Sequence, residues 1–365
     1  MAPDSLTLEI VAAAATLLTA VGLGVVWSAS NGRLRWLNRA MTVLACLAAT
    51  AATGLVWVNR QIDEYPTWAS LLGSTAAAAA TPPGAAIPVA VTPATRGGGQ
   101  VVSYTVTGPA SHLTMPVYAY LPPQYRTDRT TSYPVIEALH GYPGSPLQWI
   151  KKLGVVPILD TEIRAGRMAP TIVLFPYQTP APLLDTECTN LVGGPQAETF
   201  LTEDVPAFAR AHLRVRPGPG TWGLTGFSAG AYCASDLLLR HPGEYAAAAS
   251  LSGYADPGIR VGNGSEHTTY NAVWRLTHLP VPAVALYLAC AKMDKNALRG
   301  TEQVARLAHA PMSVTTSYVN GGGHNLATWR AMEAPSFDWL SSWLGRPVQG
   351  RPAQDRAVQA SGSSR

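Results

Sequence analysis

Charged residues are scarce in this chain. Only 13% of its 365 residues are Asp, Glu, Lys or Arg, whereas 47% are hydrophobic. The formal net charge is +4 and the positive residues form no dense stripe, so a nucleic-acid partner is not expected. So low a charged fraction indicates that part of the apolar sequence lies in lipid rather than in a protein core.

Cysteine is also rare: there are four, and no two of them are spaced as C-x-x-C. The sequence therefore predicts no zinc site and no thioredoxin-like redox motif. Cys46 lies in an apolar segment and is expected to be inert. If the folded domain faces an oxidising compartment, Cys188 and Cys233 are the best candidates for a disulfide, since both flank the serine motif at residues 226–230. Free buried thiols are the alternative.

Two long apolar runs, residues 10–27 and 40–58, contain no charged residue. Each approaches the ~20 residues that cross the hydrocarbon core of a bilayer as a helix. We therefore predict a transmembrane hairpin over residues 1–60, with its spans at about 8–28 and 40–58. Two buried core helices are the alternative.

The charges around these runs set the orientation of the hairpin. A cleavable signal peptide begins with a positively charged segment. The charged side chains before the first run are those of Asp4 and Glu9, and no Lys or Arg precedes it. The connection between the runs carries Arg33, Arg35 and Arg39, and positive loops stay in the cytoplasm. We therefore expect membrane lipid around the hairpin and the rest of the chain on the extracytoplasmic side.

Composition divides the remaining chain into three parts. Residues 61–99 contain a juxtamembrane segment and a stretch rich in Ala, Pro and Gly, which is typical of a linker. The tail, residues 348–365, is expected to be disordered for the same reason. Residues 100–347 have the usual length of one α/β domain.

Apolar runs predict eight strands in this domain, at 101–107, 115–121, 135–139, 171–175, 222–227, 246–251, 284–289 and 314–319. The central runs are continuously apolar, which is typical of strands covered on both faces. The first two strands have no helix between them and should pair antiparallel. Helices are predicted between or after the later strands, at 198–212, 229–240, 296–309 and 325–344. This alternation predicts an α/β domain with a mostly parallel sheet and helices on both faces.

One strand–helix junction places a serine between glycines. The predicted strand runs into Gly226-Phe227-Ser228-Ala229-Gly230, and a helical run follows at once. In this context G-x-S-x-G is the nucleophile elbow of α/β-hydrolases, where a strained turn projects the serine hydroxyl from the sheet. The flanking glycines allow close backbone packing, and the helix N-terminus faces developing negative charge. Ser228 is the predicted nucleophile, with an ordinary glycine-rich turn as the alternative.

A serine nucleophile needs a base to take its proton, and His324 is the predicted one. It follows three glycines after the last predicted strand, where this fold places its histidine. The acid that orients the histidine should lie at a strand end between Ser228 and His324. Asp294 fits this position best. Asp256, after the preceding strand, and Glu302, inside a predicted helix, are the alternatives.

The loop HGYPG at residues 140–144 follows a central strand. In α/β-hydrolases the loop in this place supplies one backbone N–H to an oxyanion hole, and the residue after the serine supplies the other. Tyr142 and Ala229 are the corresponding residues here, and Gly141 lets the loop turn back over the sheet. A plain turn after a strand is the alternative.

Three motifs together resemble the putative esterase family that includes esterase D and the secreted mycolyltransferases. They are LHGYPGS at 139–145, GLTGFSAGAY at 223–232 and VNGGGHN at 319–325, and the likeness covers about residues 100–345. The resemblance implies an α/β-hydrolase without a metal or organic cofactor, which acts on esters or transfers acyl groups to hydroxyls. It also implies the residues already named: the triad Ser228, Asp294 and His324 and the oxyanion amides of Tyr142 and Ala229.

The segment at residues 183–206 resembles a stretch near the active site of related esterases. The resemblance implies that Glu187, Cys188 and Asn190 lie near the cleft. Mycolyltransferase-like members generally use a glutamate as the acid of the triad, whereas the residue that best fits this position here is Asp294. Mycolyl transfer is therefore not the first expectation.

The combined prediction is a serine esterase held at the outer face of a membrane. It would hydrolyse a carboxylic ester of a small molecule, lipid or glycan through an acyl-enzyme on Ser228. Transfer of the acyl group to a sugar or lipid hydroxyl is the close alternative, because both reactions use the same residues. A non-catalytic protein that binds cell-envelope glycan or lipid on the same fold is the alternative of another class.

Overall fold

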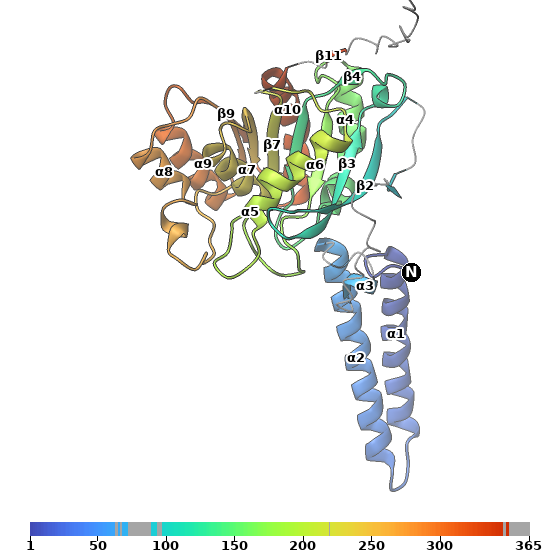
Figure 1. Cartoon of the computed structure of the whole chain (residues 1–365). Coiled ribbons are helices and arrows are strands. Elements are labelled where there is room, and N and C mark those ends of the chain that lie inside the picture. Colours follow the sequence, from blue (N-terminus) through green and yellow to red (C-terminus); the bar gives the residue numbers. More distant parts are fainter. Residues whose placement is uncertain are drawn as a thin grey trace, which may run out of the picture.

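The computed structural model describes residues 1–62, 65, 68–71, 89–92, 97–218, 220–345 and 348–349. Most of the predicted linker and nearly all of the predicted tail lie outside the described residues. The described chain comprises a helical hairpin and an α/β domain at one end of it (Figure 1).

The two apolar runs form an antiparallel pair of helices. α1 spans Leu6–Ala29 and α2 spans Arg35–Ile62, so both extend beyond the predicted spans at each end. The hydroxyl of Ser5 caps α1 by accepting a hydrogen bond from the N–H of Leu8 at 3.2 Å. No side chain of α1 is buried, and both helices are long and apolar enough to cross a membrane.

Polar contacts join the two helices at different levels. Near the middle, the hydroxyl oxygens of Thr16 and Thr53 lie 2.9 Å apart and share a hydrogen bond. At the end remote from the connecting loop, Arg60 and Glu9 form an ion pair. Such pairs satisfy polar groups in helices that otherwise expose apolar atoms, and they fix the register of the hairpin.

Among the described residues, nine strands form one sheet at the centre of the α/β domain. In spatial order they are β1 (Val89–Ala90), β2 (Gln100–Thr107), β3 (Thr114–Leu121), β6 (Ile172–Pro176), β5 (Val135–Leu139), β7 (Trp222–Phe227), β8 (Ala247–Leu251), β9 (Ala285–Ala291) and β10 (Ser313–Val319). The pairs from β1 to β6 are antiparallel, and those from β6 to β10 are parallel.

Each predicted strand is therefore present, with ends within two residues of the predicted ones, and the antiparallel start is confirmed. β1 and the separate pair β4 (Thr131–Ser132) and β11 (Val348–Gln349) have no predicted counterpart. Strands of two residues carry too short a pattern to be seen in a sequence.

Helices cover both faces of the sheet. Among the described residues, the helices after α2 are, in chain order, α3 (Trp68–Leu71), which lies beside the hairpin (Figure 1), η1 (Pro123–Tyr125), the π-helical η2 (Gln148–Leu153), α4 (Val155–Arg164), α5 (Ala197–Thr199), the π-helical η3 (Phe200–Asp204), α6 (Val205–His212), α7 (Ala229–Arg240), η4 (Ser265–His267), α8 (Ala272–His278), α9 (Lys295–Leu307) and α10 (Leu326–Leu344). The four predicted helices correspond to α5–α6, α7, α9 and α10, whereas α4 and α8 were not predicted.

Alternate side chains of each central strand point to opposite faces of the sheet and pack in two separate hydrophobic cores. Val135 and Leu139 of β5 pack on the side covered by α6, α7, α8 and α9. Ile136 and Ala138 of the same strand pack on the side covered by η2, α4 and α10. Because both faces are covered, β5 to β9 are buried along their whole lengths, which explains their continuously apolar sequences.

Glu333 of α10 is an exception within this apolar packing. Its side chain is fully buried, and neither carboxyl oxygen has a hydrogen-bond partner in the described part of the chain. Burial raises the pKa of the carboxyl to about 9, although nearby Arg330 opposes the shift. The group therefore keeps its proton in the folded protein at neutral pH and loses it on unfolding.

This proton makes stability depend on pH. Stability should fall as pH rises from ~4.3, the ordinary glutamate pKa, because the unfolded chain then binds fewer protons than the folded one. We predict that Glu333→Gln, which cannot ionise, lowers the difference in Tm between about pH 5 and 8 by at least ~3 °C. Thermal unfolding in detergent measures it, with the exposed Glu302→Gln as control. Equal pH slopes for Glu333→Gln and wild type would contradict the prediction.

Candidate active site

Ser228 lies on the turn between β7 and α7. Its φ of 56° and ψ of −121° fall outside the regions that residues with a side chain favour. The turn depends on close backbone packing: a Cβ on Gly226 would lie 2.0 Å from the carbonyl oxygen of Gly230, and one on Gly230 would lie 2.2 Å from that of Leu139. A side chain at either glycine would push the turn away from the sheet. Strained backbone of this kind is concentrated at functional sites.

Three side chains that are far apart in the sequence meet at this turn. Oγ of Ser228 lies 2.7 Å from Nε2 of His324, and Nδ1 of His324 lies 2.6 Å from Oδ2 of Asp294. They follow β7, β10 and β9, so all three lie at the edge formed by the carboxyl ends of the parallel strands. The side chain of Asp294 is 5% exposed and that of His324 is 42% exposed, so the acid is shielded while the imidazole can be reached from outside.

Helix termini hold the aspartate and the histidine in place. Asp294 caps α9, since its Oδ1 accepts a hydrogen bond from the N–H of Ala297 at 3.3 Å, and Oδ2 faces His324. Asn325 caps α10 directly after the histidine. The His324 ring meets the Trp329 ring edge to face, with 5.0 Å between centroids. Both groups are therefore fixed by secondary structure on either side of them.

The two alternative acids make other contacts. Asp256 accepts a hydrogen bond from the N–H of Gly258 at 3.0 Å, within its own loop. Glu302 lies inside α9, where its half-exposed side chain is 3.9 Å from Arg306. Asp294 is the acid that the structure places against His324.

The loop at residues 140–144 passes directly beside the serine. A Cβ on Gly141 would lie 2.8 Å from the Phe227 ring and 3.3 Å from Cβ of Ser228. Glycine therefore allows the backbone of this loop to lie directly against the serine turn.

The two residues expected to supply oxyanion amides, Ala229 and Tyr142, belong to the two segments that meet here. Ala229 is the first residue of α7, and its N–H makes no hydrogen bond to any residue that the structure describes. The first N–H groups of a helix lack partners within it, so this one is open to an anion. The hydroxyl of Tyr142 donates to the carbonyl oxygen of Leu183 at 2.8 Å, which ties its loop to the segment after β6.

His140, at the start of the same loop, has a different environment from His324. Its side chain is only 3% exposed, and its Nδ1 lies 2.8 Å from the carbonyl oxygen of Gly141. Burial lowers the pKa of the imidazole to about 4, so the ring stays neutral and enclosed. His140 is part of the support of the loop rather than a base open to a substrate.

A family model described as "Putative esterase" matches residues 110–355, more than half of the chain. The chain belongs to this esterase family. An uncharacterized protein of Corynebacterium glutamicum is 23% identical over 349 residues, which cover 87% of this chain and 78% of the relative.

Solved structures show the same fold at lower identity. A ferulic acid esterase superposes with a TM-score of 0.60 at 16% identity, covering 68% of this chain and 100% of its own. An S-formylglutathione hydrolase from Agrobacterium tumefaciens superposes with a TM-score of 0.58 at 14% identity, covering 70% and 100%. The predicted α/β-hydrolase fold and esterase family are thus confirmed, and both support ester hydrolysis as the activity.

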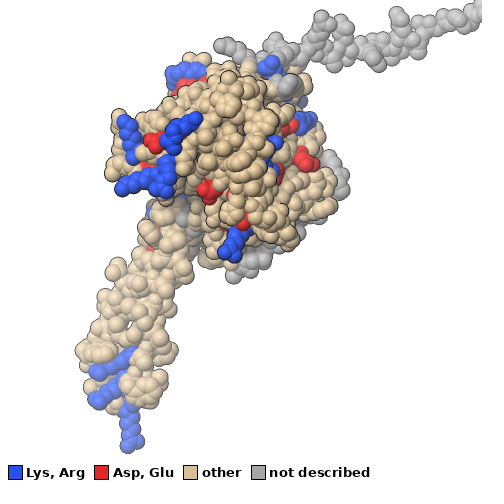
Figure 2. All heavy atoms as spheres, turned by 90° about the vertical axis from the view of Figure 1, so that its left-hand side faces the viewer, with Lys and Arg blue, Asp and Glu red and all other residues tan. Residues whose placement is uncertain are grey.

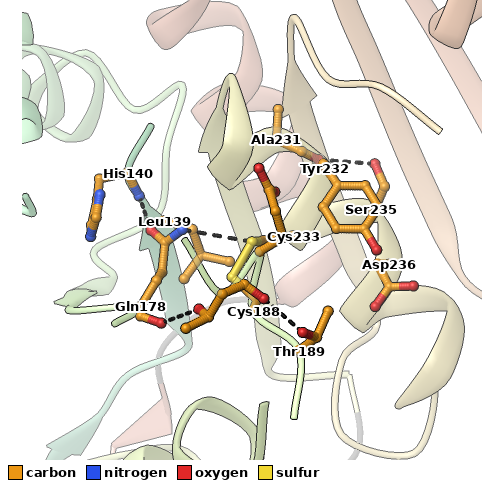
Figure 3. Close-up of a disulfide and its surroundings, with 12 residues drawn as sticks. Leu139, His140, Gln178, Cys188, Thr189, Ala231, Tyr232, Cys233, Ser235 and Asp236 are labelled. Atoms are coloured by element: carbon orange, nitrogen blue, oxygen red, sulfur yellow. Dashed lines mark hydrogen bonds between the residues drawn. A yellow bond between two sulfur atoms is a disulfide. The ribbon is translucent and has the colours of Figure 1, made fainter. Parts of the chain in front are cut away.

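In this esterase, a disulfide fastens the segment after β6 to the helix that follows the serine. Cys188 is bonded to Cys233 of α7, with their Cα atoms 5.7 Å apart (Figure 3). Gln178 lies beside it: Nε2 donates to Sγ of Cys233 at 3.6 Å, and Oε1 accepts from the backbone N–H of His140. Gln178 therefore links the loop beside the serine to the disulfide. Sequence reasoning missed it, since its only signal is a polar residue shortly after a strand end.

The other two residues expected near the cleft stabilise the same segment. Glu187 has a φ of 43° and a buried side chain that accepts a hydrogen bond from the hydroxyl of Tyr254. Burial, with a contribution from Asp185, raises the pKa of Glu187 well above its usual range. Asn190 binds Thr199 of α5 through two hydrogen bonds, at 3.0 and 3.1 Å.

The disulfide can be tested by counting thiols. We predict that the unfolded, unreduced esterase has two reactive thiols, Cys46 and Cys290, and four after reduction. The bond spans 45 residues of sequence, and its removal in Cys188→Ala/Cys233→Ala should lower the free energy of unfolding by about 2–4 kcal/mol. Cys46→Ala is the control and should leave Tm unchanged. Four reactive thiols before reduction would show that the disulfide does not form.

Proposed function

We propose that the esterase hydrolyses a carboxylic ester with Ser228 as nucleophile, His324 as base and Asp294 as the acid that orients the base. The observation that carries this proposal is the continuous relay of hydrogen bonds from Oγ of Ser228 through both ring nitrogens of His324 to Asp294, at 2.7 and 2.6 Å. A carboxylate on Nδ1 selects the tautomer in which Nε2 can accept the serine proton, and it stabilises the imidazolium that forms.

In this proposal Ser228 attacks the ester carbonyl while His324 takes the hydroxyl proton. The N–H groups of Ala229 and Tyr142 stabilise the oxyanion of the tetrahedral intermediate, each by ~3 kcal/mol. His324 then gives its proton to the leaving alcohol, and an acyl-enzyme remains on Ser228. Water, deprotonated by the same imidazole, releases the carboxylic acid and restores the serine.

Substitution of the relay tests this assignment. We predict that purified protein reacts with a fluorophosphonate probe and that Ser228→Ala abolishes the labelling, because an activated serine oxygen attacks the phosphorus of the probe and displaces fluoride. Asp294→Asn should lower kcat for an activated ester by about 10³–10⁴-fold, since the histidine loses its oriented tautomer. Hydrolysis of the activated ester, with and without alcohol acceptors, measures the activity and separates transfer from hydrolysis.

Asp256→Asn is the matched control, because Asp256 also follows a parallel strand, whereas its hydrogen bond is to Gly258 of its own loop. It should retain wild-type kcat within about twofold. Labelling that persists in Ser228→Ala, or a large loss in Asp256→Asn with none in Asp294→Asn, would refute the proposed roles.

We also propose that α1 and α2 anchor the esterase in a membrane, with a catalytic domain of residues 100–347 outside the cytoplasm. The helices have 24 and 28 residues, and at a rise of 1.5 Å they reach ~36 and ~42 Å, enough for ~30 Å of hydrocarbon. On the face seen in Figure 2, Lys and Arg gather at the loop end of the hairpin and most of the shaft is uncharged. Positive loops stay in the cytoplasm, and a disulfide suits an oxidising compartment.

Accessibility of single cysteines tests the orientation. In a Cys46→Ala background, we predict that Arg299→Cys, on the exposed surface of α9, reacts with a membrane-impermeant maleimide added to whole cells. Asn31→Cys, in the loop between α1 and α2, should react only after the cells are permeabilised. The reverse pattern would contradict the proposed orientation, and reaction of both sites in whole cells would contradict a membrane hairpin.

A further inference from the structure

The end of the hairpin opposite its loop docks on the α/β domain through η2. Nζ of Lys151 lies 2.6 Å from Oδ2 of Asp4, just before α1. Nζ of Lys152 donates to the carbonyl oxygen of Arg60, near the end of α2. Both lysines belong to the short π-helix that follows the loop at residues 140–144. The anchor therefore touches the domain within a few residues of the proposed oxyanion loop.

The same π-helix, η2, also packs against the residues that hold the serine turn in place. Trp149 of η2 packs edge to face on Phe227, the residue before the serine, with 5.1 Å between ring centroids. Arg330 of α10 donates to the last carbonyl of η2 at 3.0 Å, and its neighbour Trp329 contacts the ring of His324. One short helix thus connects the anchor to both the serine turn and the histidine loop.

These contacts decide which edge of the sheet faces the hairpin. In Figure 1 the hairpin lies below the domain, and β4, which directly precedes β5, lies at the top. The amino ends of the parallel strands therefore point away from the hairpin, and their carboxyl ends, which carry Ser228, point towards it. In the same view, the long loops that follow β6 and β8 lie at the same height as the upper end of α2.

The loops at this edge expose large apolar side chains, which we call the apolar rim. Its members, with their exposed fractions, are Tyr142 (38%), Leu183 (54%), Val192 (59%) and Met293 (70%). They follow β5, β6 and β9, the strands around the serine turn. Lys292 and Lys295 are exposed on either side of Met293. Apolar side chains flanked by lysines suit the boundary between lipid headgroups and acyl chains.

We propose that the apolar rim rests on the outer leaflet of the membrane and that the ester reaches Ser228 from the bilayer, as a membrane amphiphile. The contacts between the hairpin and η2 hold the carboxyl edge of the sheet against the leaflet, and the exposed imidazole of His324 then faces lipid headgroups. A long acyl chain that enters from this side avoids exposure to water, which is unfavourable in proportion to its length. The inference rests on the proposed ester chemistry and the proposed anchor.

Docking of the rim can be measured without any reaction. The full chain, as Cys46→Ala/Met293→Cys with an environment-sensitive fluorophore on the new cysteine, is placed in phosphatidylcholine vesicles that contain spin-labelled phosphatidylcholine. We expect about twofold quenching, because interfacial side chains reach ~5–10 Å into the boundary. Leu279→Cys is the control: it is 37% exposed but lies before the amino end of β9, at the opposite edge, and should not be quenched.

Kinetics on two esters test the route of the substrate. The rim variant Leu183→Asn/Val192→Asn/Met293→Gln should lose at least about 10-fold in kcat/KM for a long-chain ester dissolved in the vesicles, because lipid contact scales with apolar area. Its hydrolysis of a short, water-soluble ester should stay within about twofold of wild type. The control variant Leu279→Asn/Trp343→Gln should retain both activities.

The two proposals fail in different ways. Absence of quenching at position 293, or a rim variant that keeps full activity on the vesicle ester or loses both activities equally, would overturn the membrane route. Quenching with neither fluorophosphonate labelling nor hydrolysis of the soluble ester would support the docking and overturn the proposed chemistry.

Discussion

The strained turn at Ser228 is the constraint on which the rest of the site depends. A residue with a side chain is held at positive φ, and two flanking glycines allow backbone contacts that no side chain would permit. The surrounding structure must hold this unfavourable conformation. Phe227 anchors the turn among Trp149 and Trp329, whereas the disulfide and Gln178 hold α7 and the neighbouring loop from the other side.

The parallel sheet turns distance along the chain into proximity in space. Because the carboxyl ends of β7, β9 and β10 share one edge, Ser228 and Asp294 both meet His324 within hydrogen-bond distance, although they lie 96 and 30 residues before it in the sequence. The helices that follow contribute caps, since Asp294 and the residue after His324 each begin a helix. The elements that build the fold therefore also orient the three side chains of the proposed triad.

The contacts with the hairpin fix which edge of the sheet faces α1 and α2. An α/β-hydrolase domain free in solution has no preferred side, but contacts from η2 to the ends of α1 and α2 relate the sheet edge to the anchor. In the same element, Trp149 supports the serine turn while its lysines contact the hairpin. The contacts with the hairpin and the packing under the serine turn thus share one support, which is the physical basis for the proposed substrate route from the membrane.

Local pattern by itself determined the apolar hairpin, the buried strands and the serine turn, because each depends on periodicity or on glycine at fixed spacing. The sequence also indicated Ser228, His324 and Asp294 as candidates, because this fold places such groups after its strands. The sequence left Asp256 and Glu302 as alternatives for the acid, since the spacing of residues along the chain does not give the distance between their side chains in the fold. Tertiary structure alone decided that Asp294 reaches His324, that Gln178 joins the disulfide to the loop, and that the carboxyl edge of the sheet faces the hairpin. Each of these depends on contacts between segments far apart in the chain, which only the packed fold brings together.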